Sequence, residues 1–88
     1  MYELTLTIYL DFNSDKEHLI SISYVGTDVF EMKSEIDERI LSAMHSFNAN
    51  GGEVFVEMDI EHNGEYYDHD EQTIFVDLQN NRIEYGNF

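Results

Sequence analysis

The chain has 88 residues, a formal net charge of −15, no cysteine and no proline, and 42% of its residues are hydrophobic. A chain of this length makes one domain whose core buries roughly 60% of the unfolded surface. This apolar fraction is too high for a disordered acidic tail. The charge disfavours binding to nucleic acids or anionic membranes, because these are polyanions themselves. We therefore expect a single folded domain, 1–88, whose partner is cationic.

Several kinds of site and cellular location are also disfavoured. Without cysteine the chain has no disulfide, zinc–thiolate site or thiol nucleophile. The N-terminal sequence "MYELTLTIYLDF" has no basic segment, and nowhere do the roughly 18 apolar residues of a transmembrane helix occur together. We expect a soluble, unprocessed, cytoplasmic protein, located in the host cell cytoplasm if a phage encodes it.

Alternating apolar residues predict a β-hairpin in the first part of the chain. From Tyr2 to Phe12 the even positions are apolar and the odd positions are mostly polar, which is typical of a half-buried strand. "NSDKE" then supplies a polar turn. The alternation resumes at Ile20, Ile22 and Tyr24, so we expect a second strand that pairs with the first.

From Asp28 the apolar period changes to that of an amphipathic helix. The apolar stripe consists of Val29, Met32, Ile36, Ile40, Ala43, Met44 and Phe47. Asp28 and Glu31 have the spacing of a capping box, and "NANGG" is a typical helix stop. We predict one helix over residues 28–48, with Glu31, Glu35 and Glu38 on its polar side.

The second half of the chain has the pattern of a β-meander. A strand is predicted over 54–60, "HNGE" is a strong hairpin signal, and a further strand begins at Glu65. "HDEQ" predicts a looser turn before a strand over 74–78, and "QNNR" predicts a tight turn into a short strand over 83–85. The fold class is α+β, an antiparallel sheet built as ββα followed by a meander, with one helix packed on one face.

Two-residue turns in these hairpins predict which side chains face one another. The turn at Asn63 and Gly64 pairs His62 with Glu65, Glu61 with Tyr66, Ile60 with Tyr67, Asp59 with Asp68 and Glu57 with Asp70. The turn at Asn80 and Asn81 pairs Leu78 with Ile83 and Asp77 with Glu84. Like charges in facing positions destabilise a hairpin by about 0.2–1 kcal/mol, which indicates that these acids are kept for binding.

The candidate partner-binding surface is the sheet face that points away from the helix. It contains Glu53, Phe55, Glu57, Asp59, Glu61, Tyr66, Asp68, Asp70, Phe75, Asp77 and Glu84. Aromatic side chains among charges are typical of protein interfaces. Strands about 4.8 Å apart, with same-face side chains every ~6.8 Å along each strand, bring the density of carboxylates toward that of nucleic-acid phosphates. The alternative is a solvated acidic surface that only keeps the protein soluble.

Small size, absence of cysteine, strong acidity and acids interleaved with aromatics, as in "EYYDHDE", make the chain resemble phage-encoded DNA-mimic inhibitors. These include many anti-CRISPR and anti-restriction proteins. The resemblance concerns the charge, the size and the interleaving of acidic with aromatic residues along the whole chain, and it includes no diagnostic motif. It implies a viral, non-enzymatic inhibitor, most of all an anti-CRISPR protein, that blocks a CRISPR effector, restriction enzyme or nuclease. Because such inhibitors share no common fold, it implies nothing about architecture.

Two other functional classes fit the same residues. The first is an immunity protein or antitoxin that neutralises a basic nuclease, which would use the same electrostatics. Independently of function, the sequence is compatible with a homodimer. The second alternative is an acidic calcium-binding or generic interaction domain: "DIEHNGEYYDHD" places Asp59, Glu61, Asn63, Gly64 and Asp70 at positions 1, 3, 5, 6 and 12 of an EF-hand-like loop. However, position 12 is not Glu, and both flanks have strand periodicity.

The sequence contains no catalytic motif. His18, His45, His62 and His69 are scattered, and a catalytic histidine needs a positioned partner. His69 is the only one in an acidic cluster, but its chain neighbours Asp68 and Asp70 point to the opposite face of a strand. We therefore expect no enzymatic activity, no cofactor and no specific metal site.

Overall fold

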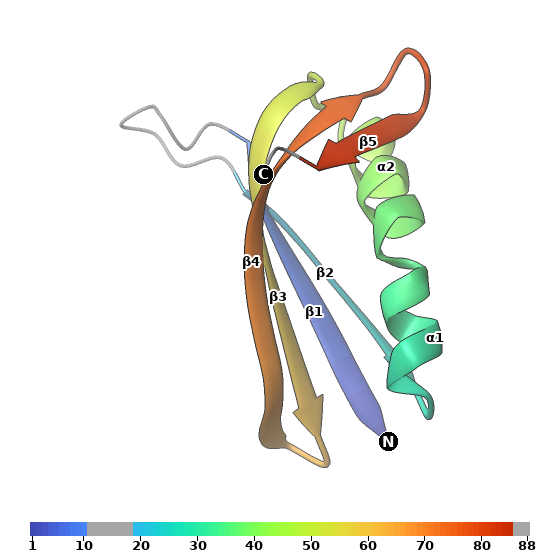
Figure 1. Cartoon of the computed structure of the whole chain (residues 1–88), viewed down its shortest axis with the longest axis vertical. Helices are drawn as coiled ribbons and strands as arrows, with labels where there is room; N and C mark the ends of the chain where they lie inside the picture. Colours follow the sequence, from blue (N-terminus) through green and yellow to red (C-terminus); the bar gives the residue numbers. More distant parts are fainter. Residues whose placement is uncertain (11–18, 86–88) are drawn as a thin grey trace.

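A computed structural model describes residues 1–10 and 19–85. The elements are β1 (Tyr2–Tyr9), β2 (Leu19–Gly26), α1 (Val29–Ser34), α2 (Ile36–Ser46), β3 (Gly52–His62), β4 (Glu65–Asp77) and β5 (Arg82–Tyr85). The strands form one antiparallel sheet in the order β2-β1-β3-β4-β5. Both helices lie on the same face of this sheet (Figure 1). The predicted α+β architecture, ββα followed by a meander, is confirmed; Phe12 and the turn "NSDKE" lie outside the described residues.

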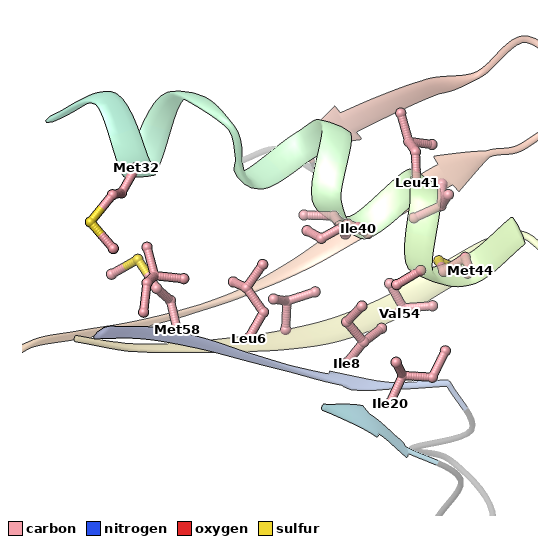
Figure 2. Packing of buried hydrophobic residues seen from close by; sticks show 14 of the residues in the cluster. Leu6, Ile8, Ile20, Met32, Ile40, Leu41, Met44, Val54 and Met58 are labelled. Atoms are coloured by element: carbon pink, nitrogen blue, oxygen red, sulfur yellow. The ribbon is translucent and has the colours of Figure 1, made fainter. Parts of the chain in front are cut away.

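The core lies between the helices and the central strands β1 and β3. Alternation along β1 and β3 buries one side of each strand, and the register pairs Leu4 with Ile60 and Leu6 with Met58. From the helices, Met32, Ile40, Leu41 and Met44 pack onto this layer (Figure 2). Most residues that the apolar periodicity assigned to the core therefore lie in it or pack against it. The prediction is wrong for Phe47, which is 65% exposed because it lies at the C-cap, where α2 ends.

The predicted single helix is interrupted at Glu35, so the prediction of one continuous helix is wrong. Asp28 caps α1 as expected, because its Oδ1 accepts hydrogen bonds from the backbone N–H groups of Phe30 and Glu31. At the break, the hydroxyl of Ser34 donates to the carbonyl oxygen of Glu31 over 2.6 Å. The N–H of Glu35 donates instead to the carbonyl oxygen of Met32, one residue closer than in an α-helix. Competition from a side-chain hydroxyl thus shortens the first helix.

The turn between β3 and β4 forms as predicted, but the pairing beyond it differs. Asn63 and Gly64 both have positive φ, 54° and 86°, as a tight hairpin turn requires. The pairs His62–Glu65 and Glu61–Tyr66 are therefore correct. The register then shifts, and Ile60 faces Asp68 instead of Tyr67. Tyr67 is the extra residue of a β-bulge.

The bulge reverses the orientation of the β4 side chains that follow it, because a shift by one residue moves each side chain to the other face. Asp59 faces His69, not Asp68, and Glu57 faces Glu71, not Asp70. The predicted outward orientation of Asp68 and Asp70 is wrong. Both residues lie on the helix-facing side, where Nζ of Lys33 is 2.9 Å from Oδ2 of Asp68.

Two further predictions about β4 are wrong. "HDEQ" is not a turn, because β4 is one continuous strand from Glu65 to Asp77. The connection to β5 spans residues 78–81, so that Asp77 faces Arg82, and Glu84 faces Phe75. The pairs Asp77–Glu84 and Leu78–Ile83 do not form. The carboxylate of Asp77 instead accepts hydrogen bonds from the backbone and side-chain N–H groups of Asn80 over 3.1 and 2.8 Å, which stabilises the wider turn.

Candidate functional site

The outer face is the sheet face opposite the helices, and Figure 1 shows both helices on the other side. The cross-strand registers place alternate residues of every strand on it. Its charged members are Glu3, Glu53, Glu57, Asp59, Glu61, His69, Glu71, Asp77, Arg82 and Glu84. The acids thus come from β1, β3, β4 and β5; β1 is distant in the chain from the other three but lies next to β3 in the sheet.

The central part of the outer face consists of rows that run across β1, β3 and β4. The rows are, in that strand order, Glu3, Glu61 and Tyr66; Thr5, Asp59 and His69; Thr7, Glu57 and Glu71; and Tyr9, Phe55 and Thr73. Side chains in directly facing positions on neighbouring strands have Cβ atoms about 4.5–5.5 Å apart. Glu3 therefore faces Glu61, and Glu57 faces Glu71, so two rows each set one carboxylate against another.

These carboxylate pairs have little compensating positive charge. Each Lys or Arg that the structure describes contacts an acid elsewhere: Lys33 contacts Asp68, Arg39 contacts Glu35 and Arg82 contacts Glu84. Within residues 1–10 and 19–85, no ion pair involves Glu3, Glu57 or Glu61. The outer face therefore retains a negative potential centred on β3.

His69 is the one basic group inside the rows. Its Nδ1 lies 2.6 Å from Oδ1 of Asp59 and its Nε2 lies 3.5 Å from Oε2 of Glu71. The hydrogen bond to Asp59, and then that to Glu71, raise the pKa of His69 above its ordinary value of 6.5. At acidic pH His69 is protonated and partly neutralises the row that contains Asp59.

The pKa of His69 gives a prediction that can be checked directly. A raised folded-state pKa means that the interaction stabilises the fold fully below pH 6.5, and that this contribution is lost as the pH rises through the folded-state pKa. In an NMR titration of the ring protons, we expect the midpoint of His69 to lie above 6.5. Asp59→Asn should lower it, whereas Asp70→Asn, a neighbour on the other face, should change it much less. Equal midpoints in the parent and Asp59→Asn would contradict the ion pair.

Aromatic side chains flank the acidic rows. The rings of Tyr9 and Phe55 face each other across β1 and β3, with centroids 5.8 Å apart. Phe75, which is 47% exposed, lies between Glu53 on β3 and Glu84 on β5. At the other end of the face, Tyr66 is 76% exposed. The outer face thus combines rows of acidic side chains with partly exposed aromatic side chains at both ends.

The structure brings most of the sequence-predicted site together. Glu53, Phe55, Glu57, Asp59, Glu61, Tyr66, Phe75, Asp77 and Glu84 lie on the outer face. Asp68 and Asp70 do not. Sequence reasoning missed Glu3, whose place beside β3 depends on strand order, and His69 and Glu71, whose orientation depends on the bulge. The alternation in β1 already places Glu3 on the side away from the core, and this is the sequence signal that could have identified Glu3 as an outer-face residue.

The geometry also separates the residues of the EF-hand-like pattern. Asp59 and Asp70 lie on opposite faces of the sheet, and the segment forms two paired strands rather than a metal-binding loop. Within the described parts of the chain, no group of three or more acidic or histidine side chains is placed to hold a metal ion. Of the other histidines, His62 stacks on Tyr2 with centroids 4.3 Å apart, and His45 lies 3.3 Å from the side-chain oxygen of Asn81. His18 lies outside the described residues.

Comparisons with protein-family models, curated proteins and solved structures found no match to this chain. In the segments that the structure describes, neither helix has the length and apolar character needed to cross a membrane.

Proposed function

We propose that the protein is a non-enzymatic inhibitor that presents its outer face, as a substitute for nucleic acid, to the basic surface of a host defence protein, as anti-CRISPR proteins do. The observation that carries this proposal is the pair of facing carboxylates in two separate rows, Glu3 with Glu61 and Glu57 with Glu71. Each such pair costs the fold about 0.2–1 kcal/mol. A surface kept only for solubility has no need to place acids in directly facing positions.

The spacing of the acids supports imitation of phosphates. Neighbouring strands lie about 4.8 Å apart and same-face positions recur every ~6.8 Å, so carboxylates on β1, β3 and β4 form a two-dimensional array. Duplex DNA carries one charge per about 1.7 Å of its axis. One strand alone is too sparse to match this, but adjacent rows together approach it. Lys and Arg side chains that bind phosphates would meet a comparable field.

The aromatic residues on the same face would contribute to the binding free energy through apolar contacts, which salt does not screen. Phe55 and Phe75 are on the outer face beside Glu53, and Tyr66 lies beside Glu61. Partly exposed aromatic side chains are frequent hot spots in protein interfaces. We infer that charge attracts and orients the partner in the cytoplasm, while the rings contribute to the lifetime of the complex.

A salt and competition experiment tests this function. Purified CRISPR effectors, restriction enzymes and toxin nucleases would be assayed for nucleic-acid cleavage in the presence of the protein. We expect at least one to be inhibited, and inhibition to weaken steeply with salt, since the Debye length falls from about 10 Å at 0.1 M to about 3 Å at 1 M. Excess DNA should compete. The class of enzyme inhibited separates a phage inhibitor from an immunity protein, and salt-independent binding would contradict mimicry.

A further inference from the structure

One edge of the sheet is open along most of β4. In the described chain, β4 pairs with β3 along its length, but with β5 only from Ile74 to Asp77. Among the described residues, the segment from Glu65 to Thr73 therefore has a hydrogen-bonded neighbouring strand on one side only. Beyond the bulge at Tyr67, the part from Asp68 to Thr73 is regular. Alternate backbone N–H and C=O groups there point outward. The backbone N–H groups of His69 and Glu71 donate to Oδ1 of Asp68 and of Asp70, over 2.9 Å each, and an added strand would replace these local hydrogen bonds.

A groove of about 320 Å³ lies directly behind this open edge, between the sheet and the helices. Its lining consists of Leu6, Lys33, Ile36, Ile40, Val56, Met58, Asp70, Glu71, Gln72, Ile74 and Tyr85. Apolar side chains from β1, β3, β4 and α2 make up much of this lining, together with polar residues from α1, β4 and β5.

Two side-chain contacts made by lining residues of the groove join the helices to the sheet. Lys33 of α1 forms an ion pair with Asp68 of β4 over 2.9 Å. The hydroxyl of Tyr85 in β5 donates a hydrogen bond to Asp37 of α2. Burial and this hydrogen bond raise the pKa of Tyr85, so the hydroxyl keeps its proton at physiological pH.

The charge of the edge selects the kind of strand that fits it. Asp70 and Glu71 present one carboxylate on each face of the edge, and the nearest Lys, Lys33, is already paired with Asp68. A second copy of β4 would set acids against acids, which is how natural edge strands avoid self-association. A basic strand reverses that repulsion. Charge alone is enough to protect an edge strand from self-association. The apolar groove behind this edge is not needed for that protection, so it is a separate feature.

We propose that the edge from Asp68 to Thr73 binds an extended, basic segment of a partner protein by β-augmentation. The added strand continues the sheet in line with β5. Its side chains on one face are apolar and enter the groove beside Ile36, Ile40 and Met58. Those on the other face are Lys or Arg and meet Glu71. Backbone hydrogen bonds provide affinity and the alternate side chains provide specificity. This site shares Glu71 with the outer face, but it does not depend on nucleic-acid mimicry.

The test uses isotope-labelled protein and a short acetylated, amidated peptide in which Lys and Val alternate. We expect NMR shift changes and slower amide exchange confined to residues 68–73 and to the groove residues of α2. A peptide with the same charge, but N-methylated at alternate residues, should not bind, because it cannot make the edge hydrogen bonds. Equal binding of both peptides, no binding of either, or changes confined to the outer-face residues of β1 and β3 would overturn the proposal.

Charge variants provide a matched comparison. Glu71→Lys places a cation at the edge and should weaken peptide binding at least about tenfold, because like charges would face each other at the interface. Glu53→Lys makes the same change in net charge on the outer face, away from the open edge, and should have a much smaller effect. Spectra of the free variants show whether each is folded. Equal weakening by both would identify general electrostatic attraction and contradict a defined edge site.

Discussion

Replacing Glu57 and Glu61 together by Lys is expected to abolish partner binding and to leave the domain as stable as the parent, or slightly more stable. Glu57 faces Glu71 and Glu61 faces Glu3, so each Lys converts a repulsive cross-strand pair into an attractive one. The gain is at most about 1 kcal/mol per pair on an exposed surface. Facing a basic partner, the same Lys residues replace attraction by like-charge contact, which costs several kcal/mol. Thermal melting and inhibition would be measured on the same samples.

The helices offer a control with the same change in net charge. Glu31 and Glu38 are exposed on α1 and α2, on the other side of the molecule from the outer face. The double variant Glu31→Lys/Glu38→Lys should keep most of the binding. If the outer-face variant has a markedly lower melting temperature, the replaced carboxylates stabilise the fold. If it inhibits as well as the parent, they do not contribute to binding. In either case the mimicry proposal is wrong.

Ile60→Ala is expected to lower the free energy of unfolding by about 2–5 kcal/mol, the usual cost of truncating a buried aliphatic side chain. Ile60 is 1% exposed and faces Leu4 on the neighbouring strand, in the layer covered by the helices. This loss is a large fraction of the total, because the free energy of unfolding of a native protein is only about 5–15 kcal/mol. Urea unfolding of the two proteins, compared at equal slope, gives the difference.

Phe30 supplies the control for this core substitution. It is 85% exposed on α1, although its side chain is larger than that of Ile60. Phe30→Ala should change the stability by no more than about 0.5 kcal/mol. If the two variants lost similar stability, burial against the helices would not be what holds β3 in place, and the assignment of the core would have to change.

Much of the fold could be predicted from sequence because strand periodicity is a strong local signal. The alternation in β1 and β3 identifies the buried sides, and Asn63–Gly64 identifies the hairpin turn, since both residues tolerate positive φ. The same signals locate most of the outer face. Its acids on β3 are in the predicted orientation because no irregularity precedes them in that strand.

The errors arise where a single side chain or an extra residue overrides the local pattern. A bulge at Tyr67 adds one residue to β4, and no residue type in "EYYDHDE" marks the position of such an insertion. Ser34 divides the helix through one hydroxyl hydrogen bond to Glu31. The position of Glu3 beside Glu61 needs the strand order, in which β1 lies between β2 and β3, and local periodicity does not provide it.

The bulge at Tyr67 also gives one short segment two separate roles. Beyond it, the side chains of the odd-numbered His69 and Glu71 point to the outer face, whereas those of the even-numbered Asp68 and Asp70 point to the helix-facing side. Substitutions at alternate positions of β4 therefore act mainly on one face of the sheet, although Glu71 contributes both to the outer face and to the lining of the groove. An insertion or deletion of one residue next to the bulge would exchange the two sets at once. The hairpin is thus a point at which a small genetic change can redirect the protein toward a different partner while its composition and net charge stay almost the same.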